Sequence, residues 1–137
     1  ILNMKNTIVI SKQYYPKIIL YLNNLQEDHN YNELIQTLDD LYEDNKKFNL
    51  LIDTYLMVNV KLKYLYLFGM YLKNLKNKPR LLQYTIIEVY HDYIYNLLYY
   101  LFTYLSKPVA KVTVIHYIHK NINNDINNII KIKDYFP

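Results

Sequence analysis

One acid, Asp53, stands near the end of the apolar run FNLLIDTYLM, just before a segment that is typical of a helix. In α/β proteins, a carboxylate at the carboxyl end of a buried strand often binds a ligand or a metal, or transfers protons. The same carboxylate can instead accept a backbone hydrogen bond from the following loop, as in an Asx turn. No further acid occurs before Glu88 and Asp92. We therefore interpret Asp53 as a capping residue, with a binding-edge role or catalysis as the alternatives.

The other side chains capable of metal binding or nucleophilic chemistry form no recognisable motif. His116 and His119 straddle the end of a predicted strand, where residues three apart point to opposite faces. His29 and His91 fall in loops without an acidic partner pattern. The absence of cysteine excludes thiolate metal sites and cysteine nucleophiles, and the single glycine excludes glycine-rich phosphate loops. The sequence therefore predicts no metal, no cofactor and no enzymatic activity.

The composition is that of one folded domain with a strong bias in codon use. Of 137 residues, 52% are hydrophobic and 20% are charged, which indicates a packed core rather than disorder. Tyrosine occurs 18 times, whereas glycine, alanine and arginine occur once each. This bias favours an AT-rich genome, such as that of a giant virus, and a location in the host-cell cytoplasm if the protein is viral.

The net charge of +4 does not by itself indicate a nucleic-acid partner, because the same codon bias inflates lysine. We interpret the basic segment 73–80 as a solvated helix end. The longest uncharged apolar run, 93–106, has 14 residues, whereas a membrane-spanning helix needs about 20. The first residues lack the pattern of a signal peptide. Because the chain starts with isoleucine, we expect either a segment upstream or a start at Met4.

Hydrophobic periodicity predicts strands that alternate with helices. The predicted strands span 7–11, 17–24, 48–54, 81–90 and 110–118. The predicted helices span 29–47, 61–77, 91–108 and 121–136. The continuous apolar run of the third strand predicts burial on both of its faces.

This order predicts a single α/β domain over 1–137, with a core at about 7–117. We expect a mostly parallel five-stranded sheet with a β-hairpin at its start. The crossovers predict a βα superhelix with the helices mainly on one side. Segment 121–137 is expected to form a terminal helix or a frayed tail.

The third predicted helix has too little polar surface for a helix that buries only one face. Its core stripe consists of Ile94, Leu97, Leu98, Leu101 and Leu105. One flank carries Tyr95, Tyr99 and Phe102, and the other carries Tyr93, Tyr100 and Tyr104. Tyrosine combines a large apolar body with a polar tip and is favoured at interfaces. We therefore predict a candidate interface at Tyr95, Tyr99 and Phe102, with codon-driven tyrosines on a solvated helix, or a lipid-facing role, as alternatives.

The order of elements, with FNLLIDTYLM followed by a helix that opens after Asn59, resembles a STAS domain, the domain of anti-sigma-factor antagonists. The resemblance covers about 7–117. Asp53 matches the acid at the end of the family's strand, and KLKYLYLF matches the helix that follows. Lys61 and Leu62 stand where the family has its Asp-Ser phosphoacceptor pair. CRAL-TRIO lipid-binding domains share the superhelix and give the second resemblance.

The first resemblance implies a non-enzymatic protein-interaction domain without the usual phosphoacceptor serine. It places the partner-binding residues in the loop and the helix start, at Asp53, Thr54, Asn59, Lys61 and Leu62. We expect a protein partner or self-association. The alternative is a small lipid- or ligand-binding module of CRAL-TRIO type, which uses apolar space between the helices and the sheet.

Overall fold

A computed structural model describes residues 7–122 and 125–137. The strands in this part of the chain are β1 (Ile8–Ser11), β2 (Lys17–Leu22), β3 (Phe48–Asp53), β4 (Leu82–Val89), β5 (Lys111–Ile122) and β6 (Asp125–Tyr135). The helices are α1 (Asp28–Glu43), α2 (Leu62–Leu75) and α3 (Asp92–Tyr100), and α3 continues into a π turn, η1 (Leu101–Leu105).

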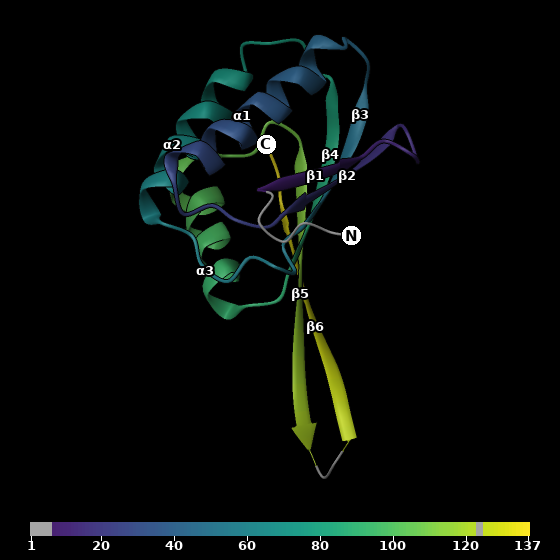
Figure 1. Cartoon of the computed structure of the whole chain (residues 1–137), viewed down its shortest axis with the longest axis vertical. Coiled ribbons are helices and arrows are strands. Elements are labelled where there is room, and N and C mark those ends of the chain that lie inside the picture. Colours follow the sequence, from purple (N-terminus) through teal and green to yellow (C-terminus); the bar gives the residue numbers. More distant parts are fainter. Residues whose placement is uncertain (1–6, 123–124) are drawn as a thin grey trace.

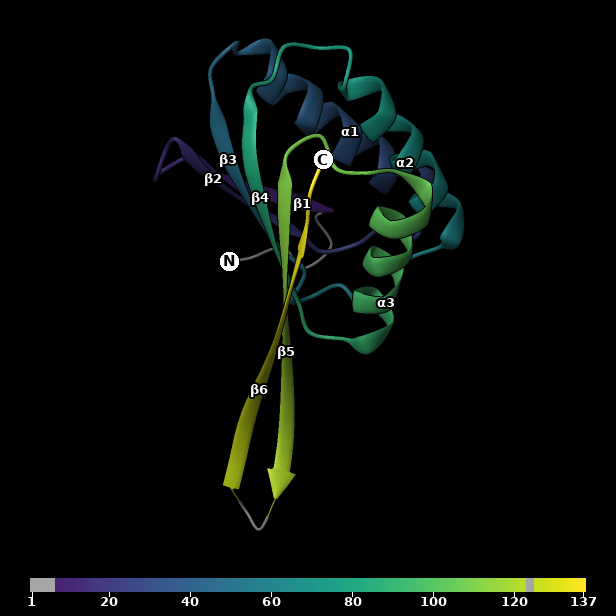
Figure 2. The same ribbon diagram turned by 180° about the vertical axis from the view of Figure 1, so that it is seen from behind.

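The described residues form an α/β fold, as the alternating pattern predicts, around one six-stranded mixed sheet. The strands lie in sequence order from β1 to β6. β2, β3, β4 and β5 are parallel to one another, whereas β1 and β6 are antiparallel to their neighbours at the two edges. All three helices lie on one side of the sheet (Figures 1 and 2). The expectation of a mostly parallel five-stranded sheet is therefore wrong in strand number and in the antiparallel carboxyl-terminal edge.

The carboxyl-terminal segment forms a strand and not the terminal helix or frayed tail expected for 121–137. β6 pairs antiparallel with β5, from Val112 opposite Tyr135 onward. Isoleucine and asparagine, which dominate this segment, are weak helix formers, and isoleucine favours strands. The stretch 130–133 also alternates isoleucine with lysine, which is a period of two.

Part of the β5–β6 pair extends beyond the sheet. β4 pairs with β5 only as far as His116, and from Tyr117 onward β5 pairs with β6 alone. Figure 1 shows this two-stranded ribbon projecting away from the helices and the other strands.

The core fills the space between the helices and one face of the sheet. Along β3, Phe48, Leu50 and Ile52 are buried, whereas the alternate residues on the opposite face are half-buried. The prediction that this strand is buried on both faces is therefore wrong, although its position is confirmed. The reason is that the described helices cover only one face, and Leu51 lies on the other face between Ile19 and Ile86 of the neighbouring strands.

The π turn changes which side chains of the third helix enter the core. The Ser106 N–H donates to the Leu101 carbonyl at 2.9 Å, which is an i to i+5 bond. The extra residue in this turn shifts the phase of the helix, so that Leu101 and Phe102 are buried and Leu105 is only half-buried. Here α3 and α2 approach closely, because a Cβ on Gly69 would lie 3.3 Å from the Leu101 Cδ1 atom.

Candidate functional site

Asp53 closes the turn that follows β3. Its Oδ1 atom accepts a hydrogen bond from the Tyr55 N–H at 2.8 Å. This is the geometry of an Asx turn, in which a side chain takes the place of a backbone acceptor. The capping interpretation is thereby confirmed, and this carboxylate oxygen is occupied by the backbone of its own loop.

The remaining residues of the predicted loop site are only partly brought together at the surface. Thr54 is 2% exposed, and its hydroxyl and its N–H both donate to the Glu88 carbonyl, at 2.8 and 3.1 Å. It is therefore closed to a partner and to a modifying enzyme in the folded state. Asn59, Lys61 and Leu62 are exposed and lead directly into α2.

An acid and two tyrosines join the carboxyl end of β4 to the middle of β5. The Tyr117 hydroxyl donates to the Glu88 carboxylate at 2.7 Å, and the Tyr117 ring stacks on Tyr90 with 5.1 Å between centroids. The hydrogen bond to Glu88 raises the pKa of Tyr117 to about 12, and burial raises the pKa of Tyr90 to about 12. Both hydroxyls therefore stay protonated at neutral pH. Within the described residues no group of three or more possible metal ligands occurs.

His116 is part of the core. It is 2% exposed, its ring stacks on Tyr95 at 4.8 Å, and its Nε2 atom lies 3.3 Å from an Asp92 carboxylate oxygen. Burial lowers the pKa of His116, with Asp92 opposing that effect, so the neutral ring is favoured. The side chain of His119 lies outside the described part of the structure.

Two of the three residues of the predicted tyrosine interface point inward. Phe102 is 6% exposed and packs on Tyr135 with 5.2 Å between ring centroids. Tyr95 is half-buried against His116, and of the three only Tyr99 is exposed, at 43%. The assignment of Phe102 to a surface is therefore wrong. The physical causes are the π turn, which rotates Phe102 inward, and β6, which brings Tyr135 over this flank.

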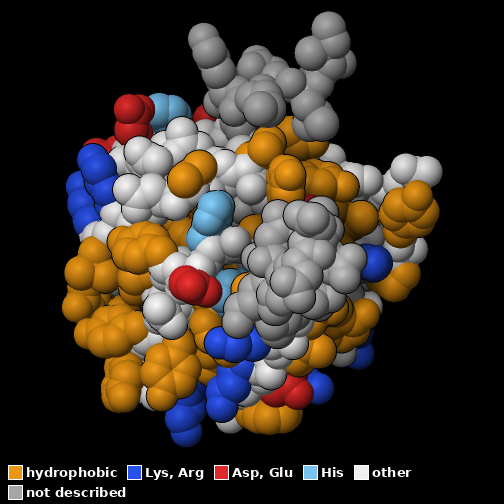
Figure 3. All heavy atoms as spheres, turned by 90° about the horizontal axis from the view of Figure 1, so that it is seen from below, with side chains coloured by type: hydrophobic (Ala, Val, Ile, Leu, Met, Phe, Trp, Pro, Cys, Tyr) orange, Lys and Arg blue, Asp and Glu red, His pale blue; other side chains and the backbone are white. Residues whose placement is uncertain are grey.

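The opposite flank of α3 forms an exposed apolar surface together with α2. We name it the α2–α3 surface, and its residues are Leu62, Tyr66, Met70, Tyr93, Tyr100 and Tyr104. These side chains are 37% to 67% exposed. Figure 3 shows hydrophobic side chains gathered on the left, which is the side where Figure 1 places the helices.

Direct contacts make this surface continuous across the two helices. The Tyr66 and Tyr100 hydroxyl oxygens are 3.3 Å apart and share a hydrogen bond. The Tyr100 and Tyr104 ring centroids are 5.5 Å apart. At the other end, the Tyr93 hydroxyl donates to the Val60 carbonyl at 3.1 Å, which joins the start of α3 to the loop before α2. The surface therefore begins at the helix start that sequence reasoning singled out, and it lies on the flank of α3 that carries Tyr93 and Tyr100, opposite the flank of the predicted interface.

The area of the α2–α3 surface is comparable to that of the largest apolar patch on a typical monomer. Aromatic side chains bury about 150–250 Å² each, so six roughly half-exposed side chains of similar size present on the order of 500 Å². The largest apolar patches on monomers are about 300–600 Å². One partner in a standard interface buries about 800 Å², of which this surface supplies more than half.

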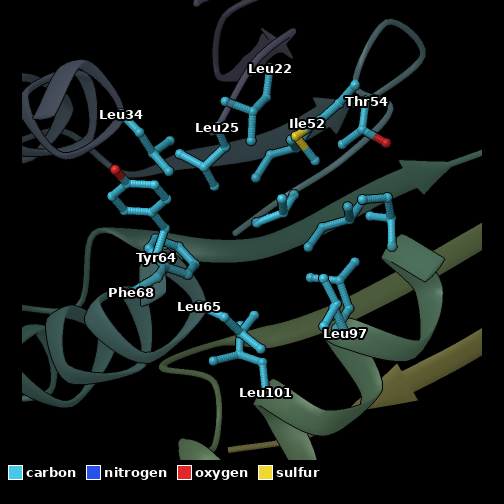
Figure 4. A pocket seen from close by; sticks show the side chains of 15 residues that line it. Leu22, Leu25, Leu34, Ile52, Thr54, Tyr64, Leu65, Phe68, Leu97 and Leu101 are labelled. Atoms are coloured by element: carbon cyan, nitrogen blue, oxygen red, sulfur yellow. The ribbon is translucent and has the colours of Figure 1, made fainter. Parts of the chain in front are cut away.

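An apolar cavity of about 70 Å³ lies on the inner side of the same helices (Figure 4). Its wall combines leucines from α2 and α3, such as Leu65, Leu97 and Leu101, with Ile52 from β3 and Leu22 from β2. A second apolar cavity of about 50 Å³ shares Ile52, Phe68 and Ile87 with the first. At about 24 cal/mol per Å³, leaving the first cavity empty costs on the order of 1–2 kcal/mol of stability.

Comparison with known proteins adds no family, since no family model, curated protein or solved structure matches the chain. The STAS and CRAL-TRIO resemblances therefore rest on the order of elements and on the residues around Asp53. Over the residues that the structure describes, every helix is too short or too polar to span a bilayer.

Proposed function

We propose that the protein is a non-enzymatic interaction module that binds another protein through the α2–α3 surface. The observation that carries this proposal is the run of contacting, half-exposed apolar side chains on two neighbouring helices. Leu62 and Met70 on the outer face of α2 are 48% and 63% exposed. Tyrosine and methionine are enriched at protein interfaces.

The charges around this surface favour an acidic partner. Positions 54–87 contain no aspartate or glutamate, so α2 and its flanking loops carry only positive formal charges. Lys61 and Lys73 are exposed at either end of the stripe formed by Leu62, Tyr66 and Met70. We infer that the partner presents an apolar segment flanked by acids, because complementary charge steers association and suppresses wrong pairings.

The STAS resemblance fits this proposal in one respect. The resemblance and the α2–α3 surface both include the start of the helix after β3, where Lys61 and Leu62 are exposed. The family's phosphoacceptor pair is replaced by these two residues, and the nearest hydroxyl, on Thr54, is buried. We therefore propose binding that does not depend on phosphorylation of this loop.

The test compares the native chain with the double variant Tyr66→Glu with Tyr100→Glu, which places two acids in the α2–α3 surface. Each chain captures proteins from a cell lysate, and the captured proteins are quantified by mass spectrometry. A partner that the variant loses is then purified and titrated into the isotope-labelled native chain. We expect amide shift changes confined to α2 and α3.

Tyr84→Glu is the matched control, because Tyr84 is 41% exposed on the other face of the sheet. It should retain the partner. Binding that is equal in all three chains, or shift changes that map to the sheet, contradicts the proposal. Binding that instead requires anionic lipid vesicles, measured by co-sedimentation, replaces the protein partner with a membrane surface.

A further inference from the structure

The cavity beneath α2 and α3 is built to exclude water. Two hydroxyl groups occur among the residues that line it, on Thr54 and Tyr64. The Thr54 hydroxyl donates to the Glu88 carbonyl at 2.8 Å, and the Tyr64 hydroxyl donates to Asp28 at 2.7 Å. A buried water needs two to four polar partners, which this wall does not supply. The cavity is therefore dry.

The packing of the two helices explains why the space is there. α2 packs tightly on η1 at Gly69, where a Cβ would lie 3.3 Å from a Leu101 atom and 3.5 Å from a Leu105 atom. The cavity is lined by the parts of both helices that precede this approach, through Tyr64, Leu65 and Leu97. Figure 4 shows these side chains converging on one space below Ile52 and Leu22.

Phe68 divides this space from the second cavity. It lines both of them together with Ile52 and Ile87. Its ring is half-buried and packs beside Tyr71 with 6.1 Å between centroids, so one of its neighbours lies outside the cavities. If the ring turns aside, the joined space reaches about 120 Å³. An apolar cavity of about 150 Å³ accepts benzene or xenon.

We propose that the two cavities, with Phe68 as the partition between them, form a binding site for a short alkyl chain. The chemistry of the first cavity's wall selects hydrocarbon, because its two hydroxyl groups are already engaged and it contains no charged side chain. The second cavity is lined mainly by apolar side chains and likewise contains no charged one. A polar headgroup stays outside the cavity and contributes little to binding. This proposal is independent of the α2–α3 surface, which lies on the other side of the same helices.

The first experiment titrates the full chain with xenon and with a matched series of hexan-1-ol, hexanoate and hexylamine. Methyl NMR shifts follow Leu65, Leu97 and Ile87. All four probes should shift these methyl groups and raise the melting temperature, with similar affinities for the three headgroups. Shifts confined to α2–α3 surface residues, or no shift with any probe, overturn the proposal. Binding restricted to one headgroup overturns the claim that the wall selects the chain.

Two variants act on the cavity in opposite directions. Val60→Leu adds a methylene to the wall of the first cavity and should weaken hexan-1-ol binding about tenfold, the discrimination that one methylene in an apolar pocket supplies. Phe68→Leu opens the partition and should strengthen binding. Ile86→Val, on the other face of the sheet, is the matched control and should leave the affinity unchanged. If Val60→Leu does not fold, the Phe68→Leu variant tests the proposal on its own. An affinity of Phe68→Leu for hexan-1-ol that is equal to or weaker than that of the native chain overturns the proposal.

Discussion

A buried polar side chain near the start of the fold makes hydrogen bonds that hydrophobic patterning does not predict. Asn30 is 1% exposed on α1, and its amide nitrogen donates to the Thr7 hydroxyl at 2.6 Å. Its Oδ1 atom accepts from the Glu27 N–H at 2.9 Å, which satisfies a backbone group at the first turn of the helix. One side chain therefore joins the helix start to the segment that enters β1.

Asn30→Ala should lower the free energy of unfolding by about 2 kcal/mol, because it leaves the buried Thr7 hydroxyl and the Glu27 N–H without their partner. Urea denaturation measures the change. Gln36→Ala is the control on the same helix, since Gln36 is exposed, and it should stay within about 0.5 kcal/mol of the native chain. Equal stability of the two variants contradicts the role given to Asn30.

The bond between Tyr117 and Glu88 predicts a loss of stability in alkali. The pKa of Tyr117 is raised to about 12 in the folded state, whereas an unfolded tyrosine ionises near pH 10. Above pH ~10 the unfolded chain releases a proton that the folded chain retains, so the free energy of unfolding falls as pH rises toward ~12. Tyr117→Phe should flatten this fall, whereas Tyr84→Phe should not. Denaturation at a series of pH values measures both slopes, and equal slopes contradict the prediction.

At the scale of elements, local patterns suffice for segments that carry a clear hydrophobic period of their own. The strands β1 to β5 and the three helices fall near the expected ranges, because each has a clear period of two or 3.6 or a short β-branched run. The strand β6 does not, because its conformation depends on pairing with β5. The same error misplaces Phe102, which packs on Tyr135 of β6, whereas Tyr100 and Tyr104 are exposed.

The π turn is the second feature that periodicity cannot reveal. A plot at 100° per residue assumes an uninterrupted α-helix and therefore assigns Leu105 to the core and Phe102 to the surface. The inserted residue buries Phe102 and leaves Leu105 half-buried against the core. By contrast, the Asx turn at Asp53 depends only on residues two positions apart, so it was predictable from the sequence.

The described helices cover one face of the sheet, so adjacent positions on β3 should differ sharply in how much stability a charged substitution costs. Leu50 is 3% exposed beneath the helices, so Leu50→Asp buries an unpaired charge and should unfold the domain, at a cost of several kcal/mol. Leu51 is half-buried on the uncovered face, so the carboxylate of Leu51→Asp reaches water. That variant should stay folded and lose about 1–2 kcal/mol of apolar packing. Circular dichroism melting tests the pair, and an unfolded Leu51→Asp chain contradicts the uncovered face.

The close packing of α2 on the π turn predicts that a larger side chain at Gly69 lowers the stability of the fold. The Cβ of any larger residue would lie 3.3 Å from the Leu101 Cδ1 atom, so Gly69→Leu should force the helices apart and cost about 1–3 kcal/mol. Met70→Leu, one residue along and 63% exposed, is the control and should change stability by less than about 0.5 kcal/mol. Denaturant midpoints compare the two variants. A native-like midpoint for Gly69→Leu contradicts a tight crossing at this position.

For the whole molecule, charge and apolar surface act in opposite directions on self-association. The net charge is +4, and Lys61 and Lys73 stand at the ends of the exposed α2 stripe. Two copies that meet through their α2–α3 surfaces bury apolar area but also bring like charges together. An acidic partner gains from the same apolar area and is attracted by the lysines. The sign of the salt dependence therefore distinguishes the two kinds of association.

We expect the native chain to be a monomer at low salt and to self-associate as salt rises, because the Debye length falls from about 30 Å at 0.01 M to about 3 Å at 1 M. Tyr66→Lys with Tyr100→Lys should stay monomeric throughout, since it adds charge and removes apolar area from the contact. Analytical ultracentrifugation across this range measures both chains. Binding to the acidic partner should weaken over the same range. Self-association that is strongest at low salt, or that persists in the double variant, places the contact between copies elsewhere on the molecule.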